Sequence, residues 1–350
     1  MASKLIAADN ILLFPHIGID GDCAGCTYAV ASMLRSMGKN VYALYEEELP
    51  DTLNFLDAGG IFTKNAGVIA DDSLDISMCI DNGGFDRFPN YAEKFKKAKL
   101  TLCLDHHETS IIRDNGETRG IAELSHIDPG AAACGVLTFE LLRELEAQWT
   151  AAGNPSILPD KAIGEAIFTA ITTDTGNFQY SNTNRRCHEI MAELYDWDID
   201  VSKISVTLYE NERIEAIEVR SKAVSRMKIL SDGLGVISYL KKSELDDLGI
   251  LPGETDSIID LMRTMRGVEF AAFLKEKEAG VIRVSLRAKS TGNVAEIAEK
   301  FGGGGHIKAA GCTINATVEE AADMIAAEIE KAAYGLTAKN PKKGMKHDAG

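Results

Sequence analysis

The sequence predicts an α/β protein: an N-terminal parallel sheet with helices on both faces, a connector helix, and a smaller C-terminal α+β domain. Short apolar runs alternate with helical patterns and short loops through the first half of the chain, which is typical of a parallel sheet. At 350 residues the chain exceeds what one typical hydrophobic core supports. We therefore expect a first domain over residues 1–199, a connector helix over 200–226 and a second domain over 227–335.

The elements of the first domain follow in order along the chain. Apolar runs predict strands at residues 11–16, 41–45, 76–80, 100–104 and 123–127. Helical patterns lie between them or after them, at residues 23–37, 91–98, 131–148 and 161–172. Each helix can carry the chain back across the sheet, so neighbouring strands are expected to run parallel.

The second half of the chain has a different pattern. The polar stretch 200–226 has helical periodicity and predicts the connector. Strands are then expected at 227–230, 235–240, 268–275 and 281–288, and helices at 256–265, 294–301 and 318–333. Residues 336–350 are rich in Lys, Gly and Asn, which predicts a disordered tail.

Composition excludes some classes of function. With 37 basic and 53 acidic residues the formal charge is −16, which argues against binding of long duplex DNA through phosphate contacts. A local basic pocket for a short or small phosphate substrate is still compatible with this charge. The chain has no apolar run of about 18 residues, and Asp9 and Asn10 interrupt its N-terminal apolar stretch, so a cytoplasmic protein without a membrane span is expected.

The seven cysteines are expected to be reduced core thiols, because their number is odd and most lie in apolar runs. Cys23 and Cys26 form a CxxC pattern. A redox or zinc role would need a second pair or a thioredoxin-like setting, and neither is visible. Packing at the start of a helix is the favoured interpretation.

Acidic and histidine residues gather where three predicted strands end. His16, Asp20 and Asp22 follow the first strand, Asp81 follows the third, and Asp105-His106-His107 follows the fourth. In parallel sheets ligands bind beyond the carboxyl ends of the strands. Bringing carboxylates and imidazoles together is costly unless a cation compensates, and these ligands suit Mn²⁺ or a similar ion. Metal-dependent hydrolysis is therefore predicted.

Each motif also has a simpler explanation. Asp20 or Asp22 can cap the helix that follows, and Asp81-Asn82-Gly83-Gly84 can be an ordinary turn. Asp174, after the helix 161–172, can cap the chain or be a fourth carboxylate of the site. Capping accounts for one carboxylate, however, and leaves the histidines unexplained.

Two features of the second half suggest phosphate binding. The run Gly302–Gly305 before His306 fits a loop whose amides approach a phosphate, although a bare glycine run can also be a flexible loop. No GxxxxGK[ST] motif is present, which excludes a nucleoside-triphosphate P-loop. Arg287 ends a predicted strand, where it is either a phosphate clamp or an ordinary solvated residue.

These motifs, in this order, resemble the DHH phosphoesterase family, whose named motif is Asp105-His106-His107. The glycine run with His306 and the following Ala309-Ala310-Gly311 resemble the DHH-associated C-terminal domain. The resemblance covers nearly the whole chain, and the two-domain layout is most similar to the NrnA-like members. It implies a DHH catalytic domain over 1–199 and a substrate-binding domain over 227–335. Ile19 and Cys23 stand where Pro and Ala are common in these members, and neither is expected to supply a metal ligand.

The resemblance also implies a set of site residues and two Mn²⁺ ions, with Mg²⁺ or Co²⁺ as substitutes. One ion would be held by His16, Asp20 and Asp81, and the other by Asp22, Asp81, His106 and Asp174, with Asp81 as the bridge. The implied catalytic residues are Asp81, Asp105, which orients its neighbours, and His107, which contacts a phosphate or the leaving group. The implied substrate contacts are Arg287, Gly303, Gly304, Gly305 and His306.

The expected function is a Mn²⁺-dependent phosphoesterase that hydrolyses short single-stranded RNA (nanoRNA) and small nucleotides such as 3′-phosphoadenosine 5′-phosphate. One alternative is a phosphodiesterase for linear or cyclic dinucleotides of adenosine. Another is a nucleotide- or RNA-binding module without turnover, and a thiol-based redox or metal protein is a distant third. The sequence leaves the preferred substrate and the oligomeric state open, a homodimer being one alternative.

Overall fold

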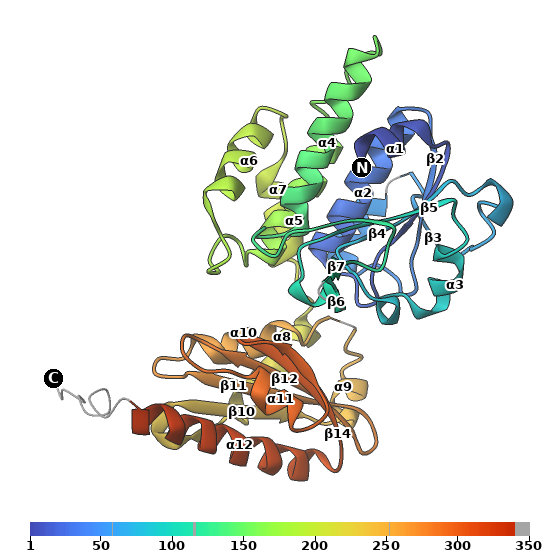
Figure 1. Ribbon diagram of the computed structural model, residues 1–350. Coiled ribbons are helices and arrows are strands. Elements are labelled where there is room, and N and C mark those ends of the chain that lie inside the picture. The colour runs from blue at the N-terminus through green and yellow to red at the C-terminus, as the bar shows by residue number, and fades with distance from the viewer. Residues whose placement is uncertain (58, 115–116, 252, 340–350) are drawn as a thin grey trace. The chain divides into compact units, whose positions relative to one another are not determined.

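The computed structural model describes residues 1–57, 59–114, 117–251 and 253–339. The chain divides into two compact units, the first from Met1 to Asn211 and the second from Glu212 onward (Figure 1). Each unit is built around a six-stranded sheet, so the α/β fold class and the division into two parts are confirmed. None of the described helices is both long and apolar enough to cross a membrane.

The sheet of the first unit has the order β3-β2-β1-β4-β5-β8 and all of its strands are parallel. Its strands are β1 (Asn10–Phe14), β2 (Asn40–Leu44), β3 (Phe62–Thr63), β4 (Ile76–Ile80), β5 (Leu100–Asp105) and β8 (Leu124–Ile127). A separate antiparallel pair is formed by β6 (Ile112–Asp114) and β7 (Glu117–Arg119). The sequence indicated the five longer parallel strands, but β3, β6 and β7 are too short to give a pattern.

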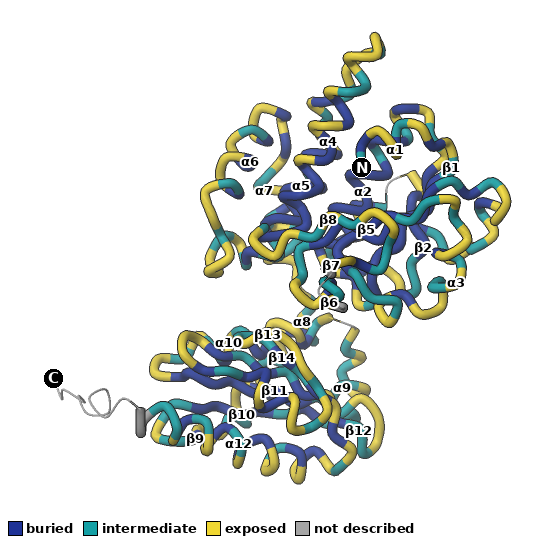
Figure 2. The backbone as a smooth tube through the Cα atoms, in the orientation of Figure 1, coloured by how far each residue is buried: buried dark blue, intermediate teal, exposed yellow. Residues whose placement is uncertain are grey.

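Helices cover both faces of this sheet. They are α1 (Ala2–Ala7), α2 (Gly21–Ser36), α3 (Ala92–Phe95), α4 (Cys134–Ala151), α5 (Lys161–Asp174), α6 (Arg185–Tyr195) and α7 (Val201–Tyr209), with 3-10 turns at Asp51–Asp57, Asp71–Ser73, Phe85–Arg87, Pro89–Tyr91 and Glu108–Ser110. Alternate residues of a strand face opposite sides. In β1, Ile11 and Leu13 therefore join the core under α2, α4 and α5, whereas Leu12 and Phe14 join the core around Phe88. Figure 2 shows these central strands buried beneath helices with exposed outer faces.

Helices α2 and α5 pack closely because small residues line their contact. A Cβ atom added at Gly25 would lie 2.4 Å from the carbonyl oxygen of Ala166 and 3.1 Å from Ala170 Cβ. Only glycine allows the two backbones this approach. The contact matters for the site because α2 begins beside Asp22 and α5 ends at Asp174.

The second unit contains a mixed sheet of order β13-β14-β12-β11-β10-β9. Its strands are β9 (Lys228–Leu230), β10 (Gly235–Leu240), β11 (Phe270–Glu278), β12 (Val281–Ala288), β13 (Gly304–His306) and β14 (Ala309–Asn315). Its helices are α8 (Ile214–Ser225), α9 (Lys242–Asp247), α10 (Ser257–Thr264), α11 (Ala295–Glu299) and α12 (Val318–Lys339), with a 3-10 turn at Ser231–Gly233. Residues of α11 and α12 share one core with the sheet, and residues of α8 and α10 share another with its opposite face.

Three sequence-based expectations are corrected here. The single connector helix over 200–226 is wrong, because α7 ends at Tyr209 in the first unit and α8 begins at Ile214 in the second, with four polar residues between them. The expected start of the tail at 336 is also wrong, because α12 continues to Lys339, and residues 340–350 lie outside the described residues. The glycine run is not wholly a loop, since Gly304–His306 form β13.

Candidate metal centre

The carboxyl ends of β1, β4 and β5 bring the predicted clusters together. Phe14 is the partner of Cys79, and Ile80 is the partner of Leu104, so the residues that follow these strands leave the sheet at one edge. His16 is 5% exposed, Asp81 3% and Asp105 fully buried. Six expected residues of this edge, namely His16, Asp20, Asp22, Asp81, His106 and Asp174, are linked by contacts of 3.5–3.8 Å between imidazole nitrogens and carboxylate oxygens.

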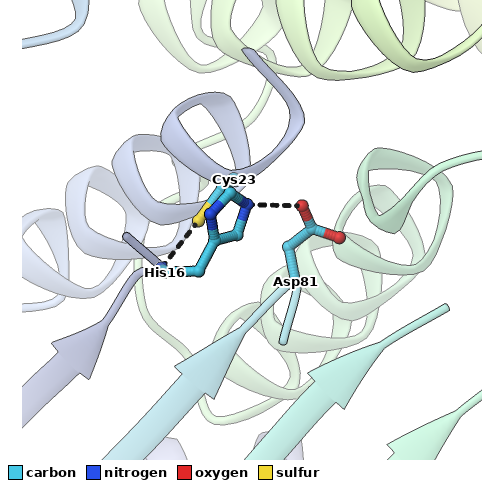
Figure 3. Close-up of side chains that lie close together, drawn as sticks. All are labelled: His16, Cys23 and Asp81. Atoms are coloured by element: carbon cyan, nitrogen blue, oxygen red, sulfur yellow. Dashed lines mark hydrogen bonds and ion pairs between the residues drawn. The ribbon is translucent and has the colours of Figure 1, made fainter. Parts of the chain in front are cut away.

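Asp81 lies at the centre of these contacts. Its Oδ2 is 3.5 Å from His16 Nε2, and its Oδ1 is 3.6 Å from His106 Nε2, so the two oxygens of one carboxylate face two histidines. Figure 3 shows the His16 contact. Asp81 has a φ of 59°, the left-handed conformation that aspartate tolerates better than most residues. The expected turn is therefore present, and it directs a carboxylate into the site.

The residues after Asp81 hold this turn in place. The Asn82 side chain donates hydrogen bonds of 3.0 Å to the carbonyl oxygens of Phe14 and Ile80. A Cβ atom added at Gly83 would lie 2.3 Å from Ser110 Cβ, so only glycine fits there. The sequence Asp-Asn-Gly-Gly thus encodes both the bend and its anchoring.

Asp22 lies in the first turn of α2 and is 2% exposed. Its two oxygens accept hydrogen bonds from the backbone amides of Cys134 (2.7 Å) and Gly135 (2.8 Å), the first residues of α4. A helix N-terminus stabilises a carboxylate in this way. Its Oδ2 also lies 3.7 Å from His106 Nε2, so Asp22 joins the N-terminus of α4 to the site.

Asp20 and Asp174 lie at the more open side of the site. Asp20 is the N-cap of α2, and its Oδ1 accepts a 3.0 Å hydrogen bond from the Cys23 amide, which confirms the expected capping. The same oxygen is 3.8 Å from His16 Nε2, and the side chain is 60% exposed. Asp174 is the last residue of α5, and its Oδ2 is 3.8 Å from His106 Nε2.

Asp105 holds the two histidines that follow it. It accepts hydrogen bonds from the backbone amides of His106 (2.7 Å) and His107 (3.2 Å), and its Oδ1 lies 2.8 Å from His107 Nδ1. The Ser110 hydroxyl donates to its other oxygen. Burial alone would raise the pKa of Asp105, but these hydrogen bonds outweigh it and lower the pKa. Burial also opposes a charge on His107, but Asp105 raises the pKa of that imidazole.

Three of the remaining carboxylates, those of Asp22, Asp81 and Asp174, are in an unfavourable environment without a cation, whereas the His16 side chain lowers the pKa of Asp20. Burial, followed by repulsion from neighbouring carboxylates, raises the pKa of Asp22 and Asp81, and the same causes raise the pKa of Asp174 to about 7. Burial also lowers the pKa of His106, which keeps a nitrogen lone pair available. Among the described residues, Asp81 Oδ1 and His106 Nε2 are buried without a hydrogen-bond partner. These donor atoms fit divalent metal ions.

The expected substrate contacts all lie in the second unit. Arg287 in β12 pairs with Ala309 in β14, which pairs with His306 in β13, so Arg287 and His306 share one row across three strands. Residues opposite each other in antiparallel strands point to the same face. Arg287 also contacts Asp260 of α10, with Nε 3.6 Å from Oδ1. Gly303, Gly304 and Gly305 lie at or within β13 on the same edge of the sheet.

The structure changes the physical reason for these glycines. A Cβ atom added at Gly303 would lie 2.2 Å from the Gly311 carbonyl oxygen, and one at Gly305 would lie 2.6 Å from the Ala309 carbonyl oxygen. Two of the glycines are therefore required by the close approach of β13 to β14. That requirement holds whether or not their amides also meet a phosphate.

Some residues of the site were not singled out from the sequence. Asn182 donates from Nδ2 to the Asp174 carbonyl oxygen (3.0 Å) and lies 3.4 Å from Asp174 Oδ2, which fixes the end of α5. Ser110 supports Asp105. Neither lies in a pattern that distinguishes it from other loop residues. All seven cysteines are buried free thiols, as expected, but Cys23 lies beside His16 and Asp81 rather than only in the helix packing.

Comparisons with known proteins agree with this geometry. The model of the DHH family N-terminal domain matches residues 10–176, and the model of the DHHA1 domain matches residues 235–335. A relative from Thermus thermophilus, named bifunctional oligoribonuclease and PAP phosphatase NrnA, is 25% identical over 334 residues, covering 93% of this chain and 91% of the relative. A relative of the same name from Bacillus subtilis is 26% identical over 329 residues, covering 92% and 94%.

A solved structure shows the same fold. The exopolyphosphatase-related protein from Bacteroides fragilis superposes with a TM-score of 0.83 at 23% identity and covers 96% of both chains. The chain therefore belongs to the DHH family, carries a DHHA1 domain, and is a hydrolytic enzyme of that family. Within the family it is NrnA-like, because relatives of that name match it over almost their whole length.

Proposed function

We propose that this protein is a Mn²⁺-dependent phosphoesterase that hydrolyses short RNA oligonucleotides and small nucleotides such as 3′-phosphoadenosine 5′-phosphate. The names of its relatives from Thermus thermophilus and Bacillus subtilis support this substrate class. The observation that carries the proposal is Asp81, a buried carboxylate whose two oxygens face His16 and His106 at 3.5 and 3.6 Å. Such a carboxylate is suited to bridge two metal ions.

Two groups of side chains would hold the metals. His16, Asp20 and Asp81 form the first group, and Asp22, Asp81, His106 and Asp174 form the second. Two divalent ions would supply a water of lowered pKa as the nucleophile and would neutralise charge on the phosphate oxygens. Mn²⁺ suits this mixture of carboxylate and imidazole ligands, and Mg²⁺ or Co²⁺ are the expected substitutes.

Asp105 and His107 act on the substrate side of the site. Asp105 fixes the orientation of the His107 ring through a 2.8 Å contact with Nδ1. The His107 side chain is 35% exposed, in contrast to the buried Asp105. Because Asp105 favours the charged imidazole, His107 can donate a hydrogen bond to a phosphate oxygen or a proton to the leaving oxygen.

The second unit would bind the part of the substrate remote from the reacting phosphate. Arg287 and His306 share one face of the sheet, where the guanidinium can bind a phosphate through two hydrogen bonds. Residues Gly303, Gly304 and Gly305 lie beside this row and would offer backbone amides.

A substrate panel tests the proposal. The chelator-treated protein would be assayed with Mn²⁺, Mg²⁺ or Co²⁺ on short RNA, 3′-phosphoadenosine 5′-phosphate, and linear and cyclic dinucleotides of adenosine. Turnover of short RNA and the bisphosphate nucleotide, fastest with Mn²⁺ and lost in Asp81→Asn, would support it. Turnover of cyclic dinucleotides alone would favour the phosphodiesterase alternative. Tight RNA binding without any turnover would favour the non-catalytic alternative.

A further inference from the structure

A thiol lies within the first group of metal-binding side chains. A nitrogen of His16, Sγ of Cys23 and an oxygen of Asp81 all lie within 4.8 Å of one another, and all three residues are buried (Figure 3). Ligand atoms around one zinc ion are about 2.0–2.3 Å from it, so atoms at these separations need only small movements to share an ion. Asp81 is 3% exposed and turns its Oδ2 toward His16, 3.5 Å from Nε2. The group therefore has the composition and the spacing of a metal site.

The Cys23 sulfur accepts a hydrogen bond within this group, although burial raises the pKa of its thiol to about 11. The backbone amide of His16 donates to Cys23 Sγ over 3.4 Å, which makes the sulfur an acceptor. Cys23 is also the third residue of α2, a sixteen-residue helix whose N-terminal dipole stabilises an anion. The thiol of Cys26, one turn further along α2, instead donates a hydrogen bond to Asp22 Oδ1 over 3.3 Å.

A packing role for Cys23 would account for only part of this arrangement. The Cys23 thiol lies 3.5 Å from the Ile80 carbonyl oxygen, and Cys79 makes the equivalent contact with Leu102. Cys79, however, belongs to the core on the opposite face of the sheet, away from His16. Asp20, the expected partner of His16, uses its Oδ1 to cap α2 and exposes 60% of its side chain. The thiol is thus better enclosed beside His16 than the carboxylate is.

We propose that Cys23 is an additional metal ligand, so that His16, Cys23 and Asp81 form a thiolate-containing site that binds Zn²⁺ or Co²⁺ more tightly than carboxylate and imidazole ligands alone would. On binding, the sulfur–metal bond replaces the S–H bond and the proton passes to solvent. Thiolate ligands select such borderline metals, whereas carboxylate and imidazole ligands alone accept Mn²⁺ readily. This revises the expectation that the residue at position 23 supplies no ligand. The inference rests on the proposed metal centre at Asp81 but not on the proposed substrates.

Cobalt spectroscopy tests the proposal independently of turnover. The full-length protein would be freed of metal with a chelator and titrated with Co²⁺ alone, with bound cobalt measured after dialysis. A cobalt–thiolate bond gives a sulfur-to-metal charge-transfer band in the near ultraviolet, which oxygen and nitrogen ligands do not give. Cys23→Ala and Cys23→Ser remove the thiol, and Cys79→Ala is the matched control because that thiol is equally buried and also contacts a carbonyl oxygen.

We expect the band in the wild type and in Cys79→Ala and its loss in both Cys23 variants, with cobalt still bound through the remaining ligands. Losing a residue that only supports a ligand costs about 10- to 100-fold in metal affinity. Losing the thiolate should weaken Zn²⁺ binding by at least that factor and Mn²⁺ binding much less. Bound cobalt without the band, or a band that persists in Cys23→Ala, would overturn the thiolate ligand and leave the proposed function intact. No cobalt binding at all would overturn the metal centre itself.

Discussion

Asp81→Asn provides the sharpest test of the two-metal assignment, because it removes a ligand of both ions while keeping the shape of the side chain. In the metal-free protein, burial and the neighbouring carboxylates oppose the charge on Asp81 and raise its pKa. A neutral amide does not meet this penalty. The metal-free variant should therefore be at least as stable as the metal-free wild type, which distinguishes loss of metal from misfolding.

The expected change in melting temperature follows from ligand linkage. A ligand at about 100 times its Kd stabilises a protein by about 2.7 kcal/mol, which raises Tm by about 5–11 °C in a unit of the size of residues Met1–Asn211. If Asp81→Asn weakens Mn²⁺ binding by about 100-fold, the same concentration contributes only about 0.4 kcal/mol and about 1–2 °C. Thermal unfolding at pH 8, with chelator or with Mn²⁺, measures both values.

Turnover should fall with the metal. Bound metals supply several kcal/mol of transition-state stabilisation, so the variant should lose about 100-fold or more in kcat, and more than His16→Ala, which affects one ion. Asp72→Asn is the control, since it makes the same change of charge at an exposed position. Substantial turnover in Asp81→Asn together with a wild-type rise in Tm on adding Mn²⁺ would refute the reasoning.

Three further predictions concern the pH dependence of stability, substrate binding and helix packing. The pKa of Asp174 is raised to about 7, so its protonated form stabilises the metal-free protein at low pH, and this contribution is lost as the pH rises to about 7. In the presence of chelator, Asp174→Asn should therefore flatten the fall of Tm over this pH range. An unchanged slope of Tm against pH would contradict this prediction. Arg287→Ala and His306→Ala should weaken cleavage of short RNA strongly, mainly through KM, and spare a small activated phosphodiester; equal losses on both substrates in folded, metal-loaded protein would show that these residues act elsewhere. Gly25→Val should destabilise the protein by about 1–3 kcal/mol in urea unfolding, because its side chain would overlap the Ala166 carbonyl oxygen 2.4 Å from the Cβ position; a midpoint equal to that of the wild type would contradict the close packing of α2 and α5.

Much of the fold could be predicted from the sequence because its strands are buried on both faces. The strands β1, β4 and β5 are continuous apolar runs, and each ends at a polar motif. Short elements could not be predicted in this way. β13 consists of two glycines and a histidine, and it is a strand only because β14 pairs with it. The break between α7 and α8 was missed for a similar reason, since helical periodicity continues through the polar residues that separate them.

For the metal centre, the amino-acid order shows which residue types follow the strands, because Asp and His stand directly after apolar runs. How these side chains face one another depends on the three-dimensional fold. Asp81 directs one oxygen to His16 and the other to His106, and Asp22 accepts hydrogen bonds from the first amides of α4. The fold also places Cys23 beside His16 and Asp81. These relations depend on the left-handed turn at Asp81 and on the approach of helices distant in sequence, which local patterns do not encode.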